Sequence, residues 1–182
     1  EVVANGNTLE VRVDGVSLFG GPVVDSALST GSVALYSWGN IGSVFDNVHV
    51  GPVDVPPTLT VDFNDGNFSD WQVVNEGTWD APSAWTVVGG ALQQTSNIYD
   101  GNTDGTVLPK KGTFAWYTNG LGWSNYKVAV QMRSTDDDAL GIMVRYQNPT
   151  NYYRFSWDAQ RLYRRLVKVV NGAVTLLRQD AV

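Results

Sequence analysis

The sequence has 182 residues, of which 43% are hydrophobic, and its formal net charge is −6. This length is sufficient for one sandwich-sized core or two small ones. The acidity argues against a nucleic-acid surface, and no apolar run approaches the roughly 20 residues that span a bilayer. There is no cysteine, so disulfides cannot stabilise the fold. No signal-like segment begins at Glu1, so we expect that a secreted form would be mature.

The charges are unevenly distributed along the chain. Residues 1–126 contain 13 acidic and three basic side chains, whereas residues 127–182 contain five acidic and nine basic ones. Two interpretations remain open. The bases either belong to solvated strand faces or gather on one sheet as a site for an anion or a polyol.

The pattern of the chain predicts strands throughout. Short runs rich in Val, Thr, Tyr and Trp alternate and are separated by Gly, Asn and Asp. In the first block, Asp14-Gly15 predicts a tight hairpin. The strands expected there cover residues 1–4, 8–13, 16–19, 32–38 and 43–50.

Residues 51–57 contain three prolines, which favour an extended linker. After it, Asn171-Gly172 predicts another hairpin. The strands expected in this second block cover residues 58–63, 85–88, 91–95, 113–116, 126–134, 140–147, 152–157, 161–170 and 173–178. About a dozen strands without helical periodicity predict an all-β fold, an antiparallel β-sandwich.

Two sets of motifs extend this prediction. The second block contains Phe63-Asn64-Asp65-Gly66 with Trp71, Asn97-Ile98-Tyr99, Arg133-Ser134-Thr135-Asp136-Asp137-Asp138, Val144-Arg145-Tyr146-Gln147, residues 151–158 and Arg164-Arg165-Leu166-Val167-Lys168. The first block contains Asn5-Gly6-Asn7-Thr8-Leu9, Val13-Asp14-Gly15, Asp25-Ser26-Ala27-Leu28, residues 31–38 and Phe45-Asp46-Asn47-Val48. Together they resemble a laminin-G-like, concanavalin-A-like jelly-roll repeat of large secreted bacterial proteins.

The order of the motifs differs from that family. Residues 58–182 are similar to the N-terminal part of the repeat, and residues 1–50 are similar to its C-terminal part. Residues 1–50 would therefore complete the sandwich either in cis, as a circular permutant, or in a neighbouring chain, by exchange. The family pattern also implies one more strand between Val182 and Glu1, and its absence would leave an edge for a partner.

Catalysis is poorly supported by the sequence. His49 is the only histidine and there is no cysteine, so nucleophilic triads lack parts. The three glutamates, Glu1, Glu10 and Glu76, are not paired with another acid along a strand, as a glycosidase would require. We therefore expect a structural His49 and a protein that is not an enzyme.

A structural calcium ion is one expected cofactor. In related jelly rolls such an ion often lies where the first and last strands meet, and the resemblance would place Asp62 and Asn64 near Asp46. Hard cations prefer several oxygen ligands. The alternative is that Asp46 merely caps a strand or turn. We expect the Asp136-Asp137-Asp138 run to be a solvated hairpin tip, since adjacent carboxylates repel one another.

Strand alternation suggests a ligand-facing patch. It places Tyr153, Phe155 and Trp157 on one face as core. The side chains expected to point outward, as a carbohydrate-binding patch on a concave sheet, are Arg145, Tyr152, Arg154 and Arg164. Aromatic faces and guanidinium groups suit sugars. The alternative is a cross-strand ladder of arginine with Asp158 and backbone carbonyls.

These observations predict a non-catalytic adhesion or assembly module, extracellular or at the cell surface, that binds a polysaccharide or glycan. Self-association with neighbouring copies is expected, and neither nucleic-acid binding nor membrane insertion is. The alternatives are a structural subunit of an extracellular filament built by complementation between successive molecules and, more weakly, an accessory module of a secreted hydrolase.

Overall fold

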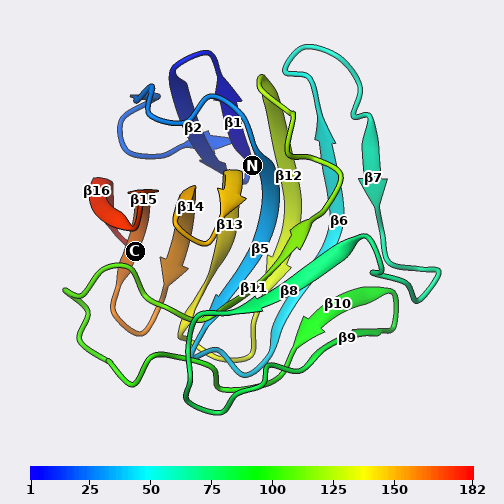
Figure 1. Ribbon diagram of the computed structural model, residues 1–182, viewed down its shortest axis with the longest axis vertical. Coiled ribbons are helices and arrows are strands. Elements are labelled where there is room, and N and C mark those ends of the chain that lie inside the picture. The colour runs from blue at the N-terminus through cyan, green and yellow to red at the C-terminus, as the bar shows by residue number, and fades with distance from the viewer.

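The computed structural model describes residues 1–182, which form two antiparallel sheets and no helix (Figure 1). The strands are β1 (Val2–Asn5), β2 (Thr8–Val13), β3 (Val16–Ser17), β4 (Val23–Val24), β5 (Ser32–Trp38), β6 (Ser43–Gly51), β7 (Leu59–Val61), β8 (Trp71–Asn75), β9 (Trp85–Val88), β10 (Ala91–Gln94), β11 (Thr113–Tyr117), β12 (Tyr126–Arg133), β13 (Ala139–Asn148), β14 (Asn151–Asp158), β15 (Tyr163–Val170) and β16 (Ala173–Ala181). The predicted all-β class and sandwich arrangement are confirmed. No helix is present that could cross a membrane.

Turn chemistry explains why the hairpins form where they do. Both residues of the turns Asp14–Gly15 and Asn171–Gly172 have positive φ, between 48° and 80°. Asp, Asn and Gly tolerate this conformation, which matches the twist of the flanking strands. The two predicted hairpins are therefore confirmed. Strands β4 and β8 were not predicted, because they are short and lie within polar, turn-rich stretches.

The connectivity interleaves the two sequence blocks. The large sheet has nine strands in the order β3-β2-β1-β12-β6-β10-β9, with β4 paired to β2 and β7 to β6. The small sheet has seven strands in the order β16-β15-β14-β13-β5-β11-β8. Strand β5 therefore lies between β13 and β11, and β6 lies between β12 and β10. In this single chain, residues 1–50 supply central strands to both sheets.

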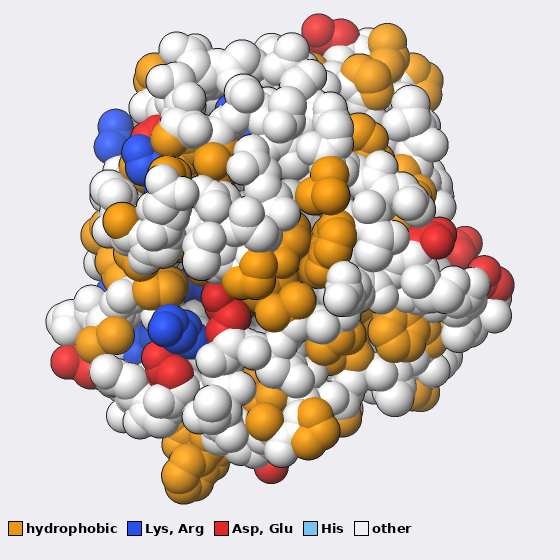
Figure 2. Space-filling view, in the orientation of Figure 1, with side chains coloured by type: hydrophobic (Ala, Val, Ile, Leu, Met, Phe, Trp, Pro, Cys, Tyr) orange, Lys and Arg blue, Asp and Glu red, His pale blue; other side chains and the backbone are white.

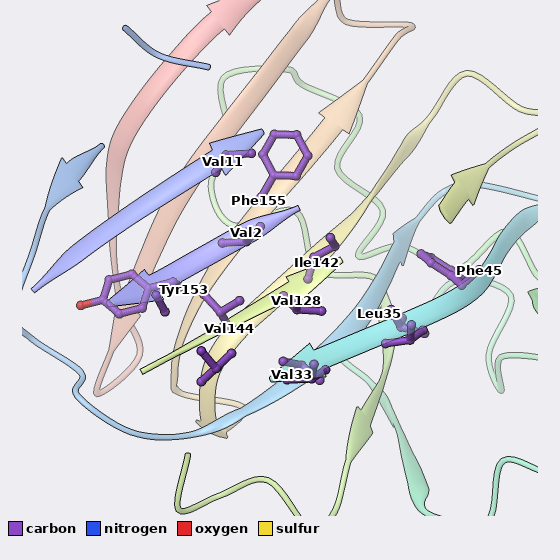
Figure 3. Packing of buried hydrophobic residues seen from close by; sticks show 14 of the residues in the cluster. Val2, Val11, Val33, Leu35, Phe45, Val128, Ile142, Val144, Tyr153 and Phe155 are labelled. Carbon is purple, nitrogen blue, oxygen red and sulfur yellow. The ribbon is translucent and has the colours of Figure 1, made fainter. Parts of the chain in front are cut away.

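The main core lies between the two sheets. Figure 3 shows side chains of the large sheet, such as Val2 and Val128, pointing toward side chains of the small sheet, such as Leu35 and Ile142. Tyr153 and Phe155 belong to this core, as strand alternation predicted, and Trp157 packs against it. Burial of this apolar surface is the main driving force for closing the sandwich.

The small sheet is also buried on its outer face, the face turned away from the large sheet. A second apolar cluster lies there, formed by Ala34, Tyr36, Trp38, Phe114, Ala139, Met143, Tyr146, Tyr152 and Val169. The connection between β10 and β11 covers part of this face. The Tyr36 hydroxyl donates to the carbonyl of Lys110 (2.6 Å), and Arg165 Nη2 donates to that of Gly105 (2.5 Å). Because both faces are covered, every residue of β5 is buried.

We expect Leu35→Ala to lower the free energy of unfolding by about 2–5 kcal/mol, because it opens a cavity in a fully buried position of β5. Urea denaturation followed by tryptophan fluorescence measures this, and a single transition is expected because both blocks share each sheet. Val24→Ala is the matched control, since Val24 is 69% exposed. Two separate transitions would contradict one cooperative unit.

Candidate functional site

The polar groups most suited to a ligand lie on the outer face of the small sheet. We call them the outer-face cluster: Tyr36 from β5, Tyr146 from β13, Tyr152 and Arg154 from β14, and Glu76, which directly follows β8. Alternation along β14 places Tyr152 and Arg154 on the same face. Residues from four strands or their ends therefore converge on one surface of the sheet.

Arg154 is the charged centre of the outer-face cluster. Its side chain is 2% exposed, and its Cζ lies 4.0 Å from the centroid of the Tyr36 ring. Arg154 Nη1 lies 4.0 Å from Glu76 Oε2, too far for a hydrogen bond. The two opposite charges therefore attract one another, but no hydrogen bond joins them.

Unpaired polar atoms are concentrated on this face. Eight enclosed side-chain N or O atoms have no hydrogen-bond partner, and only Arg145 Nε lies elsewhere. The seven on the outer face are Trp38 Nε1, Glu76 Oε2, Tyr152 Oη, Arg154 Nε, Arg154 Nη1, Tyr163 Oη and Arg165 Nη1. Buried polar groups are normally paired, and leaving them unpaired destabilises a fold. The seven atoms are thus both unpaired and enclosed within the protein.

Burial also sets the protonation of the outer-face cluster. It raises the pKa of Tyr152 to about 12 and the pKa of Tyr36 well above its ordinary value of 10.0. Burial likewise raises the pKa of Glu76. The two phenols therefore remain neutral hydrogen-bonding groups near neutral pH, beside the guanidinium of Arg154, which carries donors only.

The structure places Arg145 away from the outer-face cluster. Its backbone φ is 48°, and the pairing of β13 with β5 shifts register between Met143 and Tyr146, so Tyr146 and not Arg145 reaches the outer face. The Arg145 guanidinium is buried and donates to the carbonyls of Leu28 (2.7 Å) and Gly6 (2.6 Å). Arg145 therefore anchors loops, and the expectation that it points outward was wrong.

Arg164 lies on the opposite face of the small sheet. Its Nε and Nη2 donate to the two carboxylate oxygens of Asp180, at 2.9 and 2.8 Å, and its Cζ lies 5.6 Å from the Trp157 ring. Of the four residues expected to form one patch, only Tyr152 and Arg154 come together, and they are buried rather than outward. Carbohydrate binding by the four stays a prediction.

The sequence did not indicate that Tyr36 and Glu76 belong to the outer-face cluster. Tyr36 lies in an expected strand, and its place on the same face as Tyr152 follows only from the insertion of β5 beside β13. Glu76 follows β8, a strand that was not predicted. Glu76 is an isolated acidic residue in a polar stretch, and nothing in the local sequence indicates that it lies near Arg154 on a distant strand.

Of the residues expected to hold calcium, Asp46 lies on β6, while Asp62 and Asn64 lie just after β7, and no hydrogen bond joins Asp46 to the other two. Pairing of β6 with β7 sets Val48 opposite Val61, which brings the segments of Asp46 and Asp62 side by side. Asp62 Oδ1 accepts the backbone N–H of Asn64 (3.2 Å), a hydrogen bond that lowers the pKa of Asp62. Figure 2 shows acidic side chains gathered at the edge where the loop after β7 lies.

This set is small for a calcium site. No group of three or more His, Cys, Asp or Glu side chains is arranged to hold a metal ion. Calcium takes about 6–8 oxygen ligands, and Asp46, Asp62 and Asn64 carry only five side-chain oxygens between them. Calcium binding at these residues stays a prediction.

The remaining candidates for chemistry have other partners. His49 Nδ1 lies 3.2 Å from Thr60 Oγ1, across the pairing of β6 with β7. Glu1 and Glu10 pair with Arg12. Asp138, expected at a solvated hairpin tip, instead pairs with Arg161 at 2.5 Å, so this hairpin is held against the β14–β15 turn.

For the predicted calcium ion, the expected outcome is a lower melting temperature (Tm) after addition of a chelator, because an ion bound only to the folded state stabilises it. Differential scanning calorimetry with EDTA, and after restoration of CaCl₂, measures this. Asp62→Asn is the matched variant and should abolish the difference. Identical melting curves with and without EDTA would contradict calcium binding.

We expect Glu76→Gln to raise Tm at pH 7, by about 2 °C. Burial raises the pKa of Glu76 above 4.5, so the folded protein holds this proton more tightly than the unfolded chain. Stability is therefore lost as pH rises from 4.5 through the folded-state pKa, and the amide removes this loss.

The gain from Glu76→Gln should disappear below pH 4.5, where the carboxyl is protonated in both states. Glu10→Gln is the control. The pKa of Glu10 is lowered by its hydrogen bond with Arg12, so its replacement should give no gain at pH 7. A difference for Glu76→Gln that does not change with pH would contradict this account.

Comparison with known proteins adds no assignment: no family model, no curated protein and no solved structure matches this chain. The resemblance to laminin-G-like repeats stays an interpretation of the sequence motifs.

Proposed function

We propose that this chain is a non-catalytic carbohydrate-binding module with a role in adhesion or assembly, extracellular or at the cell surface, and that its ligand contacts the outer-face cluster. The observation that carries this proposal is the concentration of unpaired, enclosed polar atoms around Arg154, Glu76 and Tyr152. A polyhydroxylated ligand supplies both donors and acceptors, so it can satisfy a guanidinium, a carboxyl and a phenol together.

Aromatic rings support this choice of ligand class. The ring centroids of Trp116 and Tyr146 lie 5.2 Å apart, and those of Tyr146 and Tyr152 lie 6.5 Å apart. Trp116 is only partly buried, so this row of rings extends from the surface to the buried Arg154. Sugar rings present apolar faces that pack on aromatic side chains while their hydroxyls bond polar groups.

We also propose that the fold is a circularly permuted jelly roll, in which residues 1–50 complete the sandwich of residues 58–182 within one chain. The central positions of β5 and β6 support completion in cis. A filament subunit that exchanges these strands with a neighbour is the second candidate, favoured by the same interleaving, since a shared sheet can also be built between chains. An accessory module of a secreted hydrolase is the weaker alternative.

A glycan array followed by isothermal titration calorimetry tests the proposal. We expect at least one polysaccharide to bind, and Tyr152→Phe to weaken binding by about tenfold, the cost of one hydrogen bond to a buried partner. Tyr152→Phe removes a hydroxyl that has no partner in the protein, so the fold should remain intact. The control is Arg164→Ala, on the opposite face, which should leave affinity unchanged.

Two outcomes would count against the proposal. One is the absence of binding to any polysaccharide by a folded sample. The other is equal affinity of the wild type and Tyr152→Phe, which would place the ligand elsewhere.

A further inference from the structure

The connection between β10 and β11 contains a segment without regular structure, residues 100–110, that lies against the outer face of the small sheet (Figure 1). Both ends of this segment are fixed. The carbonyl oxygens of Tyr99 and Gly112 each accept two backbone N–H groups from residues 76–79, at 2.8–3.0 Å. Residues 100–110 therefore run between two fixed points beside β8, the edge strand of the small sheet.

Between these fixed points the segment makes few contacts with the rest of the protein. No backbone–backbone hydrogen bond joins it to the rest of the chain. Neither apolar cluster contains any of its residues. Three side-chain hydrogen bonds attach it to the sheet and its turns: from Tyr36 Oη to the Lys110 carbonyl (2.6 Å), from Arg161 Nε to the Thr103 carbonyl (3.0 Å) and from Arg165 Nη2 to the Gly105 carbonyl (2.5 Å). A segment with so few contacts opens locally, at a free energy well below that of global unfolding.

Two of these attachments lie on either side of Ser156 in β14. Strand pairing sets Ser156 opposite Arg165 on one side and opposite Gly141 on the other, and Gly141 opposite Tyr36. These four residues form one row across the outer face, and the segment is bonded to both ends of the row. Ser156 is therefore buried beneath the segment, two residues from Arg154 on the same face of β14.

The face beneath the segment is polar as well as apolar, and this favours opening. Arg154 and Tyr152 are 1% and 0% exposed, so a ligand reaches them only when the covering chain moves. Tyr152 Oη, Arg154 Nε and Arg154 Nη1 have no partner while the face is covered. Water pairs such atoms once they are exposed, which offsets part of the loss of the three attaching hydrogen bonds.

We propose that residues 100–110 are a lid over the outer-face cluster. The lid opens while the two sheets stay folded, admits a saccharide to Arg154 and closes over it. This inference rests on the proposed carbohydrate-binding function, for which it supplies the route of entry. Opening breaks the bonds from Tyr36, Arg161 and Arg165, and a ligand that contacts both lid and sheet shifts the equilibrium toward the closed state.

A thiol introduced into this cysteine-free chain reports its own exposure. Ser156→Cys places the thiol beneath the lid. Val33→Cys is the control in the main core, where exposure requires the sheets to separate. Without denaturant or glycan, we expect the thiol reagent DTNB to label Ser156→Cys at least about tenfold faster than Val33→Cys, because lid opening requires less free energy than unfolding.

Tyr36→Phe separates lid opening from static exposure of the thiol. It removes one of the three attaching hydrogen bonds, so it should accelerate the labelling of Ser156→Cys about fivefold. Equal labelling of Ser156→Cys and Val33→Cys would overturn the proposal, because only unfolding would then expose the outer face. A labelling rate that Tyr36→Phe leaves unchanged would overturn it too, because the thiol would then react without any opening.

A disulfide tests whether the lid admits the ligand. A Cβ atom placed on Gly105 would lie 3.8 Å from the Cβ of Arg161, the usual separation in a disulfide. Gly105→Cys combined with Arg161→Cys should therefore lock the lid when oxidised and release it when reduced. We expect the oxidised form to bind glycan at least about tenfold more weakly than the same protein in dithiothreitol.

Equal glycan affinity of the oxidised and reduced forms would overturn the lid as the route of entry. If no polysaccharide binds the wild type, the proposed carbohydrate-binding function fails. The labelling rates are measured without glycan, so they still decide whether the lid opens, and the two proposals fail separately.

Discussion

The position of β5 is the constraint on which the rest of the structure depends. This strand is paired on both edges, with β13 and β11, and buried on both faces. Its inward side chains Val33 and Leu35 join the main core, and its outward Tyr36 and Trp38 join the second cluster. Removing β5 would divide the small sheet and expose both clusters, so the first sequence block cannot be an independent unit in this arrangement.

Arg145 holds the first block in place at one end of the sandwich. Its buried guanidinium bonds the carbonyls of Gly6 and Leu28, both in the first block, while its backbone N–H donates to the Tyr126 hydroxyl (2.6 Å). Hydrogen bonds from a charged donor to buried carbonyls contribute more than neutral ones. The left-handed backbone of Arg145 also shifts the β13 register, and this shift brings Tyr146 to the outer face. One local irregularity therefore serves both the closure of the fold and the candidate site.

The sequence allowed the all-β class, the hairpins and the core face of β14 to be predicted, because turn residues and alternation are local properties. Alternation failed for Arg145 because a bulge changes strand parity, and composition does not reveal a bulge. It misled for Tyr152 and Arg154 because their face is covered by the chain between β10 and β11. The Arg154–Glu76 pair joins distant segments, so only the folded topology reveals it.

A contribution to the stability of the fold does not explain well why Arg154 and Glu76 lie close together. Taking two charges out of water costs more than their attraction returns unless hydrogen bonds complete the shell of each ion. Here the charged atoms stand 4.0 Å apart, and Nε and Nη1 of Arg154 have no partner. An apolar pair of similar size would pack this face more favourably, as the neighbouring Met143 and Val169 do. Arg154 and Glu76 therefore form an incompletely paired polar centre within an aromatic face.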